Sequence, residues 1–348
     1  MTTRPLLQLR SLSVFHPAGR RLLGGRDRAL RAVDGVDLDL EAGQTLALVG
    51  ESGCGKTSLA RGLLGLLEDV RGEVLLHPPP ARLEADPELA ALTARHGRDG
   101  TVDLLRLPPR ALRRFRRLLG LVFQDPDSAL DPHLRAWQIV AEPFAIHGVA
   151  RGAELRRRAE AMLDRVGIAP ALAERRPREF SGGQKQRLGI ARALALEPAL
   201  VVCDEPLSSL DVSVQAQILE LLETLRKERE VAFLFISHDL TVVRHAARRT
   251  AVMYAGRVVE EGLTAGLFEA PRHPYTRALL ASIPLPEPGG ERRRILLSGE
   301  PPSPRALPAG CPFHPRCPEV FERCRSEAPP FVPGRGESRS ACFLAEEG

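Results

Sequence analysis

GESGCGKT, residues 50–57, is the stretch that decides the fold of this chain. It matches the pattern G-x-x-x-x-G-K-[ST] and follows the apolar run TLALV at 45–49, which has the composition of a buried strand. Its glycines let the backbone curl so that successive N–H groups point at phosphate oxygens, and the helix expected after the loop adds its positive N-terminal end. The stretch therefore predicts a strand, a phosphate-binding loop and a helix, in that order.

Two side chains of this loop have distinct expected roles. Lys56 is long enough to reach the β and γ phosphates of a nucleoside triphosphate, and the hydroxyl of Thr57 is a ligand of the kind that Mg²⁺ prefers. We therefore expect the nucleotide to be bound by the whole loop, namely Gly50, Glu51, Ser52, Gly53, Cys54, Gly55, Lys56, Thr57 and Ser58.

The composition is that of a globular protein with a basic surface. With 348 residues the chain can form two domains, or one large domain with an appendage. Much of the net charge of +5 lies in two arginine-rich stretches, 106–117 and 151–158, which suit nucleic acid or an anionic membrane surface. Aromatic residues make up only 4% of the chain, so solvated helix faces are favoured over base stacking. No apolar run is long enough for a bilayer span or a signal core, and we expect neither membrane insertion nor secretion.

Hydrophobic periodicity predicts strands in both halves of the chain. Residues 6–15 and 32–40 alternate in polarity, which is typical of antiparallel strands, and a loop is expected between them. Residues 199–203 and 231–236 are continuous apolar runs separated by a helical stretch at 214–228. That order indicates a parallel βαβ core.

The remaining segments differ in character. Residues 77–100 are rich in proline, alanine and charge without clear periodicity, and are interpreted as an exposed insertion. Residues 133–179 have helical spacing of apolar positions. Prolines accumulate at 284–308, where a linker or a wrapped tail is expected, and four cysteines follow.

ALVVCDEP, residues 199–206, places two carboxylates at the end of a buried strand, where the ligands of parallel sheets gather. Asp204 is expected to hold Mg²⁺, directly or through water. Glu205 is expected to orient or deprotonate an attacking water.

FSGGQKQR, residues 180–187, is a turn with two glycines that opens a helix, and a helix N-terminus of this kind binds anions. Here the chain resembles the ATP-binding subunits of ABC transporters, whose signature is LSGGQ. Phe180 stands in place of the usual leucine. The resemblance extends over residues 1–270.

The resemblance implies further site residues and a head-to-tail dimer. In that family the signature of one subunit closes over the nucleotide of the other, so these residues act in trans: Ser181, Gly182, Gly183 and Gln184. Gln124 matches the glutamine that senses the γ-phosphate and the Mg²⁺ ion, which gives Thr57, Gln124 and Asp204 as the Mg²⁺ set. Asp211, in SSLD at 208–211, matches the loop after the catalytic glutamate. His238 matches the histidine that contacts the γ-phosphate.

Recognition of the base is where the chain departs from the family. An aromatic residue of the first strands usually stacks on adenine, and the matching position is His16, next to Phe15. Either ring can stack, so both are candidates, and preference for ATP follows from the resemblance alone.

Four motifs resemble the oligopeptide and dipeptide importer ATPases: VFQDPDSALDP at 122–132, HPYTRALLASIP at 273–284, SGEPPSP at 298–304 and GCPFHPRCP at 310–318. This implies a sister ATPase or a second copy, two membrane permeases, an external substrate-binding protein and a peripheral position on the cytoplasmic face. Nickel and glutathione importers share the tail in part. A soluble ABC ATPase acting on nucleic acid or ribosomes is the other alternative. Its usual coiled-coil insertion or second cassette is missing here, and nucleic acid is not expected as a partner.

Cys311, Cys317, Cys324 and Cys342 form the pattern C-x5-C-x6-C-x17-C. Disulfides are disfavoured in the reducing compartment that contains ATP, and the spacing is neither a zinc ribbon nor the usual ferredoxin run. Some peptide-importer ATPases carry a 4Fe–4S cluster at such cysteines, so the resemblance implies a cluster. Zn²⁺ with His314 as a possible ligand, and unligated thiols, are the alternatives.

Together these observations predict an α/β fold: a P-loop nucleotide-binding domain with a mainly parallel core sheet, an N-terminal antiparallel β subdomain, a helical signature subdomain and a C-terminal cysteine-rich tail. The expected domains are an ATPase domain at 1–270, with its helical subdomain at 133–182, and a C-terminal extension at 271–348. The cofactors implied are ATP and Mg²⁺, with the cluster or zinc in the tail.

Overall fold

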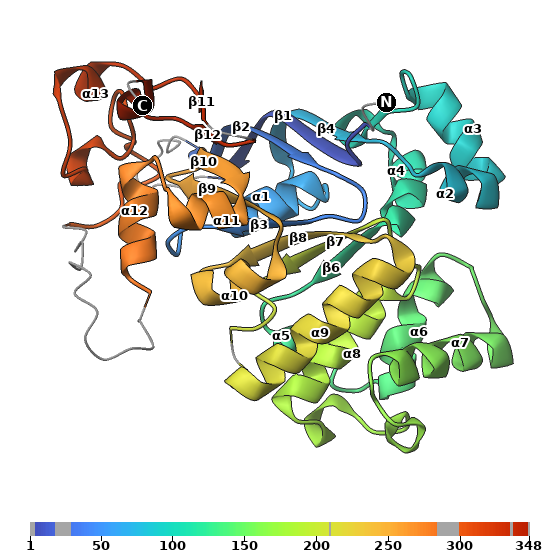
Figure 1. Cartoon of the computed structure of the whole chain (residues 1–348). Coiled ribbons are helices and arrows are strands. Elements are labelled where there is room, and N and C mark those ends of the chain that lie inside the picture. The colour runs from blue at the N-terminus through green and yellow to red at the C-terminus, as the bar shows by residue number, and fades with distance from the viewer. Residues whose placement is uncertain (1–3, 18–28, 209, 284–298, 335–336, 347–348) are drawn as a thin grey trace, which may run out of the picture. The chain divides into compact units, whose positions relative to one another are not determined.

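The computed structural model describes residues 4–17, 29–208, 210–283, 299–334 and 337–346. Most of the loop expected between the first two strands, and the proline-rich residues 284–298, lie outside this part. Figure 1 labels the helices and strands. The chain divides into two compact units. The first comprises residues 1–7, 40–44 and 75–236, and the second comprises residues 8–39, 45–74 and 237–348. Each unit is described by itself.

The second unit contains the N-terminal sheet, in the order β2-β1-β4. Its strands are β1 (Leu7–His16), β2 (Leu30–Leu40) and β4 (Asp69–Leu76). Buried and partly exposed residues alternate along β1, as expected for a strand with one face on the core. The last two residues of β4, Leu75 and Leu76, belong to the first unit, where they pair antiparallel with β5 (Val102–Asp103). The two predicted N-terminal strands are confirmed.

A second sheet of this unit has the order β11-β12-β10-β9-β3. All residues of β3 (Thr45–Val49) are buried, and β3 pairs parallel with β9 (Arg249–Tyr254). β10 (Arg257–Leu263) returns antiparallel to β9 through Ala255 and Gly256, which have φ values of 47° and 83°. Two central residues with positive φ form the tight turn that joins antiparallel strands.

The C-terminal tail extends this sheet. β12 (Arg339–Ser340) pairs antiparallel with β10, and β11 (Val332–Pro333) pairs antiparallel with β12. The core strands therefore form a mixed set of pairings, and the expectation of a mainly parallel core sheet was wrong on this side. The reason is that the β9–β10 hairpin leaves a strand edge, and the tail covers it.

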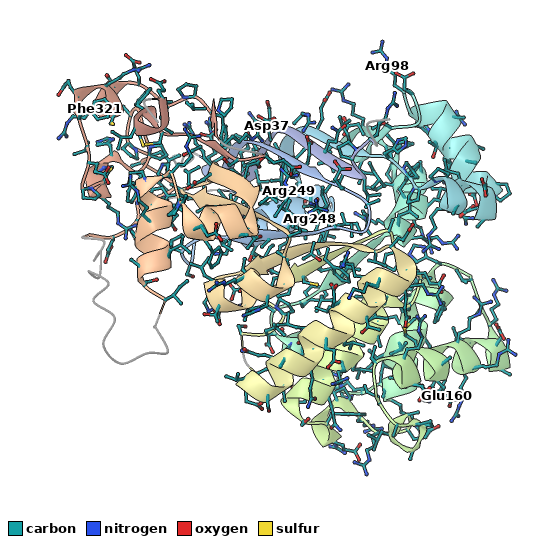
Figure 2. All side chains as sticks on the ribbon, in the orientation of Figure 1. Asp37, Arg98, Glu160, Arg248, Arg249 and Phe321 are labelled. Carbon is teal, nitrogen blue, oxygen red and sulfur yellow. The ribbon has the colours of Figure 1, made fainter. Side chains whose placement is uncertain are left out.

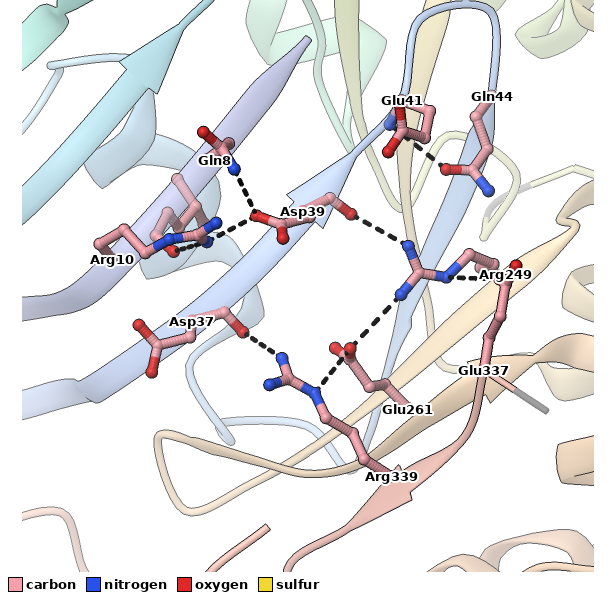
Figure 3. Close-up of polar contacts among 11 residues, drawn as sticks. Gln8, Arg10, Asp37, Asp39, Glu41, Gln44, Arg249, Glu261, Glu337 and Arg339 are labelled. Carbon is pink, nitrogen blue, oxygen red and sulfur yellow. Dashed lines mark hydrogen bonds and ion pairs between the residues drawn. The ribbon is translucent and has the colours of Figure 1, made fainter. Parts of the chain in front are cut away.

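Figure 3 shows the polar contacts around these strands. Arg339 donates from Nε to Glu261 at 2.8 Å and from Nη2 to the backbone oxygen of Asp37 at 3.3 Å. Arg249 lies 3.4 Å from the same Glu261 oxygen and 3.5 Å from the backbone oxygen of Asp39. Glu261 is buried, so two arginines from distant parts of the chain compensate its charge.

The helices of the second unit are α1 (Lys56–Leu63), α10 (Leu240–Ala246), α11 (Thr264–Glu269), α12 (Pro274–Ala281) and α13 (Glu322–Ser326). A continuous apolar core joins β3 and β9 to α10, α11 and α12. It also includes Cys311 and Phe313 of the tail.

The first unit contains a parallel set of strands, in the order β8-β7-β6. These are β6 (Leu119–Val122), β7 (Leu200–Asp204) and β8 (Ala232–Ser237), with α9 (Val212–Arg229) connecting the last two. The predicted βαβ core is confirmed here.

The helical part of the first unit contains α5 (Pro126–Ala129), α6 (Ala136–Ile146), α7 (Gly152–Arg165) and α8 (Gly182–Leu194). This confirms the helical prediction for 133–179. Residues 152–158 of the arginine-rich stretch lie in the largely exposed first half of α7, where Arg156 pairs with Glu160 at 2.7 Å. Figure 2 labels Glu160 on this helix. No helix among the described residues is both long and apolar enough to cross a bilayer.

Residues 77–100 are folded into two short helices, α2 (Pro80–Ala85) and α3 (Pro87–His96), followed by α4 (Pro109–Phe115). Asp86 caps α3 by accepting from the backbone N–H of Leu89 at 3.1 Å. It also pairs with Arg114 of α4. The periodicity was too weak to reveal these helices because only Leu89 and Thr93 of α3 are buried.

Candidate functional site

The phosphate loop follows β3 and depends on close backbone contacts. Gly50, Gly53 and Gly55 have φ values of 154°, 80° and 109°. A Cβ atom on Gly50 would lie 2.2 Å from the backbone oxygen of Met253, and one on Gly55 would lie 2.2 Å from that of Ala32. Neither separation is possible for real atoms, so any side chain at these two positions would displace the loop.

Lys56 opens α1 and is buried, with an exposed fraction of 5%. Its ammonium group donates to the backbone oxygens of Gly50 at 2.8 Å and Glu51 at 3.0 Å. The positive charge is therefore held across the loop, beside the first N–H groups of α1, where an anion is favoured. Thr57 and Ser58 follow in the first turn of the same helix.

The two candidate base-stacking residues have different surroundings. The Nε2 atom of His16 lies 2.8 Å from the hydroxyl of Ser58, in the helix that follows the phosphate loop. The ring of Phe15 instead lies against the guanidinium groups of Arg31 and Arg71, which are 5.3 Å and 4.3 Å from its centroid.

The first unit brings Gln124 and Glu205 together. Gln124 follows β6, Glu205 follows β7, and the Gln124 amide donates to the Glu205 carboxylate at 3.1 Å. Glu205 has a φ of 46°, a strained value for a residue with a side chain, and its N–H donates to Ile236 at 3.1 Å. Asp204, at the end of β7, is 6% exposed. Two of the predicted residues thus lie in contact at the carboxyl end of parallel strands.

The signature residues form the N-terminus of α8. The Ser181 hydroxyl accepts from the N–H of Gln184 at 3.3 Å, and the Gln184 side chain accepts from the N–H of Ser181 at 3.0 Å. This reciprocal capping fixes the start of the helix. A Cβ on Gly183 would lie 2.5 Å from Val214, so α8 and α9 approach closely there, and Gly182 precedes it.

Asp211 and His238 both follow strands of the parallel set. Asp211 caps α9 by accepting from the N–H of Val214 at 2.9 Å, and a hydrogen bond from Ser213 lowers the pKa of its carboxyl. His238 is exposed directly after β8. Ser209, within the predicted segment 208–211, lies outside the described residues.

The four cysteines of the tail line one cavity, together with Phe313, His314 and other tail residues. The N–H of Cys311 donates to the backbone oxygen of Cys324 at 2.9 Å. Burial raises the pKa of the Cys311 and Cys317 thiols to about 11. Among the described residues, no three His, Cys, Asp or Glu side chains are grouped so that they could hold a metal ion. The tail thus brings its four thiols to one cavity.

Sequence reasoning missed two contacts to the phosphate loop. Tyr275 and Arg316 of the tail both contact Glu51. They lie in the motifs at 273–284 and 310–318, which served above only as marks of family resemblance. No sequence signal marked either contact, because the burial of Arg316 is visible only in the folded structure.

The comparisons with known proteins define the class first. Residues 33–208 match the family model described as ABC transporter. The cbiO1 structure from Clostridium perfringens, part of an ABC transporter complex, aligns with a TM-score of 0.60 and 25% identity over 77% of this chain and 92% of that one. A dimeric ATP-binding cassette bound to ADP and phosphate aligns with a TM-score of 0.59 and 26% identity over 74% of this chain and 98% of that one. The chain has the fold of an ABC ATPase.

The subfamily follows from the tail and from curated relatives. Residues 259–324 match the C-terminal region of oligopeptide/dipeptide transporters. A probable peptide ABC transporter ATP-binding protein of Sinorhizobium fredii is 45% identical over 97% of this chain and 90% of its own length. The oligopeptide transport protein OppF of Escherichia coli is 42% identical over 93% and 92%. The chain belongs to the oligopeptide/dipeptide family of ABC transporter ATP-binding subunits, ATPases coupled to transport.

Proposed function

We propose that this chain hydrolyses ATP to drive the import of oligopeptides or dipeptides. The observation that carries the proposal is the phosphate loop, with its glycine-dependent backbone and the Lys56 ammonium group held across it. Relatives aligned over almost the whole chain are named for oligopeptide or dipeptide transport. Those names favour peptides over nickel or glutathione, and over action on nucleic acid or ribosomes.

In this proposal the loop residues 50–58 bind the phosphates of ATP. Lys56 and the N-terminus of α1 oppose the negative charge, which grows on the transferred group during hydrolysis. Thr57, Gln124 and Asp204 hold Mg²⁺, because hydroxyl, amide and carboxylate oxygens are ligands that suit this ion. The ion supplies positive charge to the phosphates.

Glu205 orients the attacking water and accepts its proton. Its strained backbone and the hydrogen bond from Gln124 support this role, because both fix the direction of the carboxylate. Because Gln124 is also one of the three proposed Mg²⁺ ligands, it would connect the Glu205 carboxylate to the metal site. His238, exposed after β8, contacts the γ-phosphate.

We propose that the site is completed in trans by a second subunit, either a sister ATPase or another copy. The capped N-terminus of α8 supplies an anion site for the partner's nucleotide through Ser181, Gly182, Gly183 and Gln184. Asp211 belongs to the loop that follows Glu205. The dimeric form of the similar cassette supports this arrangement.

We propose His16, and not Phe15, as the residue that stacks on the base. His16 contacts Ser58 in the helix that opens at the phosphate loop, whereas the Phe15 ring is already covered by two guanidinium groups.

The first test replaces Glu205 with Gln, which keeps the shape and removes the base. We expect ATP hydrolysis to fall by about a hundredfold or more, while ATP binding persists and ATP-bound dimers accumulate in light scattering. In the matched control Lys56→Ala, we expect ATP binding itself to be lost. A Glu205→Gln variant that turns over ATP at the normal rate contradicts the role of Glu205.

The second test compares His16→Ala with Phe15→Ala. Loss of base stacking is worth roughly 1 kcal/mol or more, about fivefold in the Kd for ATP. We expect this loss for His16→Ala alone, measured by fluorescence titration. A weaker Kd for Phe15→Ala alone would assign stacking to Phe15.

We further propose that the chain works as a peripheral subunit on the cytoplasmic face of a membrane, with two permeases and an external substrate-binding protein. Residues 1–270 would form the ATPase domain, with its helical subdomain at 133–182, and residues 271–348 the extension. The match of the extension to the C-terminal region of peptide transporters supports this division.

The third test is a gentle detergent pull-down from native membranes, followed by mass spectrometry. We expect two multispanning permeases, with a sister ATPase if the dimer is a heterodimer. Recovery of ribosomal proteins or nucleic acid without a membrane partner would overturn the transport proposal.

For the tail we propose a 4Fe–4S cluster held by Cys311, Cys317, Cys324 and Cys342, with Zn²⁺ as the alternative. Support comes from the donor set, since all four thiols line one largely apolar cavity. The raised pKa of Cys311 and Cys317 means that binding must displace protons, so the affinity of the site falls as the pH falls. A bound cluster would hold these separate parts of the tail together.

The fourth test is iron and sulfide analysis of anaerobically purified protein, with its visible spectrum. We expect four of each per chain and broad iron–sulfide absorption, both reduced in Cys324→Ser. Zinc without visible absorption would assign the alternative. Thiols that bind neither metal would remove the cofactor from this proposal.

A further inference from the structure

The tail contacts the phosphate loop at one residue, Glu51. Arg316 donates from its two terminal nitrogens to the two carboxylate oxygens of Glu51, at 2.7 Å and 3.0 Å. The hydroxyl of Tyr275 accepts from the backbone N–H of Glu51 at 2.9 Å. Arg316 is 8% exposed and Tyr275 is fully buried, so both contacts are largely shielded from water.

The fold holds both tail residues in place. Arg316 ends a 3₁₀ turn (His314–Arg316) between Cys311 and Cys317, and its guanidinium lies 5.9 Å from the centroid of Tyr254. The Tyr254 and Tyr275 rings are 4.6 Å apart, and Phe313 packs against both rings. A bidentate arginine within such a cluster has little freedom to leave its partner.

Glu51 is well placed to transmit this restraint. It follows Gly50, whose φ is 154°, and its backbone oxygen accepts from Lys56 at 3.0 Å. Fixing its N–H and its carboxylate therefore fixes the backbone that turns toward the phosphates, and with it the position of the Lys56 ammonium group. Preorganised donors bind charge better than donors that must first be ordered.

An independent feature joins the tail to the same part of the loop. A second cavity is lined by residues 51–54 of the loop and by Pro301, Pro302 and Pro304 of the tail. Arg31 and Tyr254 complete part of its wall. The tail thus approaches the first turn of the loop from two segments that are separate in sequence.

We propose that Arg316 and Tyr275 are positioning residues for ATP binding. They hold the first turn of the phosphate loop in its phosphate-binding conformation, so that the C-terminal extension is a working part of the nucleotide site. The inference rests on the phosphate-loop assignment proposed above. It extends that assignment to two residues that touch no phosphate.

The test measures the Kd for ATP and the melting temperature of the full-length chain and its variants. We expect Arg316→Ala to raise the Kd by about tenfold. Arg316→Lys should raise it less, because an ammonium group keeps the charge although it cannot form the two parallel bonds. The double variant Glu51→Ala/Arg316→Ala should have the same Kd as Glu51→Ala alone, since the two residues act as a pair. Tyr275→Phe should raise the Kd by about threefold or more through the unsatisfied N–H of Glu51.

Arg277→Ala is the matched control. Arg277 pairs with Glu319 at 2.9 Å in the same extension and is partly exposed, so its removal breaks a tail ion pair without touching the proposed pairing. We expect its Kd to equal that of the wild type.

The outcomes separate this inference from the proposed function. If Lys56→Ala abolishes binding while Arg316→Ala and Tyr275→Phe bind ATP with the wild-type Kd, the positioning role is overturned and the ATP site stands. If Lys56→Ala binds ATP normally, the phosphate-loop assignment itself fails. If Arg316→Ala does not fold, the Kd values of Arg316→Lys and Tyr275→Phe decide whether the positioning role holds. A weaker Kd at unchanged melting temperature supports the inference, and a lower melting temperature at unchanged Kd refutes it.

Discussion

The structure depends on the absence of side chains at two glycines. At Gly50 and Gly55 the backbone approaches other backbone oxygens so closely that a single carbon atom would not fit. This closeness lets the chain turn from a buried strand into α1, whose N-terminus favours an anion. β9, the parallel neighbour of β3, takes part in this arrangement because its residue Met253 supplies the backbone oxygen that excludes a side chain at Gly50. Core packing and the nucleotide site are thus set by the same few atoms.

The sequence predicted those features that local chemistry encodes. Glycines with fixed spacing after an apolar strand, and carboxylates at the end of another, have few structural solutions. In the structure Gly50 directly follows β3, and Asp204 ends β7. The antiparallel addition of β12 to β10 could not be predicted, because two residues such as Arg339 and Ser340 carry no strand periodicity. Helices α2 and α3 escaped because few of their residues are buried, although Asp86 before Pro87 is a readable capping signal.

The tail differs from the rest of the chain in what stabilises it. It contributes Tyr275, Leu280, Cys311 and Phe313 to the apolar core, and it is also held by ion pairs and short strand pairings. Its four thiols share one cavity while burial keeps the protons on Cys311 and Cys317. Pairwise contacts of this sort leave no periodic pattern, so Arg316 could not be recognised from sequence alone.

The separation of Glu51 and Arg316, 265 positions along the chain, has a consequence for synthesis. The ribosome makes the phosphate loop first and its arginine partner 265 residues later. A nascent chain therefore carries β3, its loop and α1 well before Arg316 can reach them. If the loop gains its binding conformation from the tail, the growing polypeptide binds ATP more weakly until residue 316 has left the ribosome.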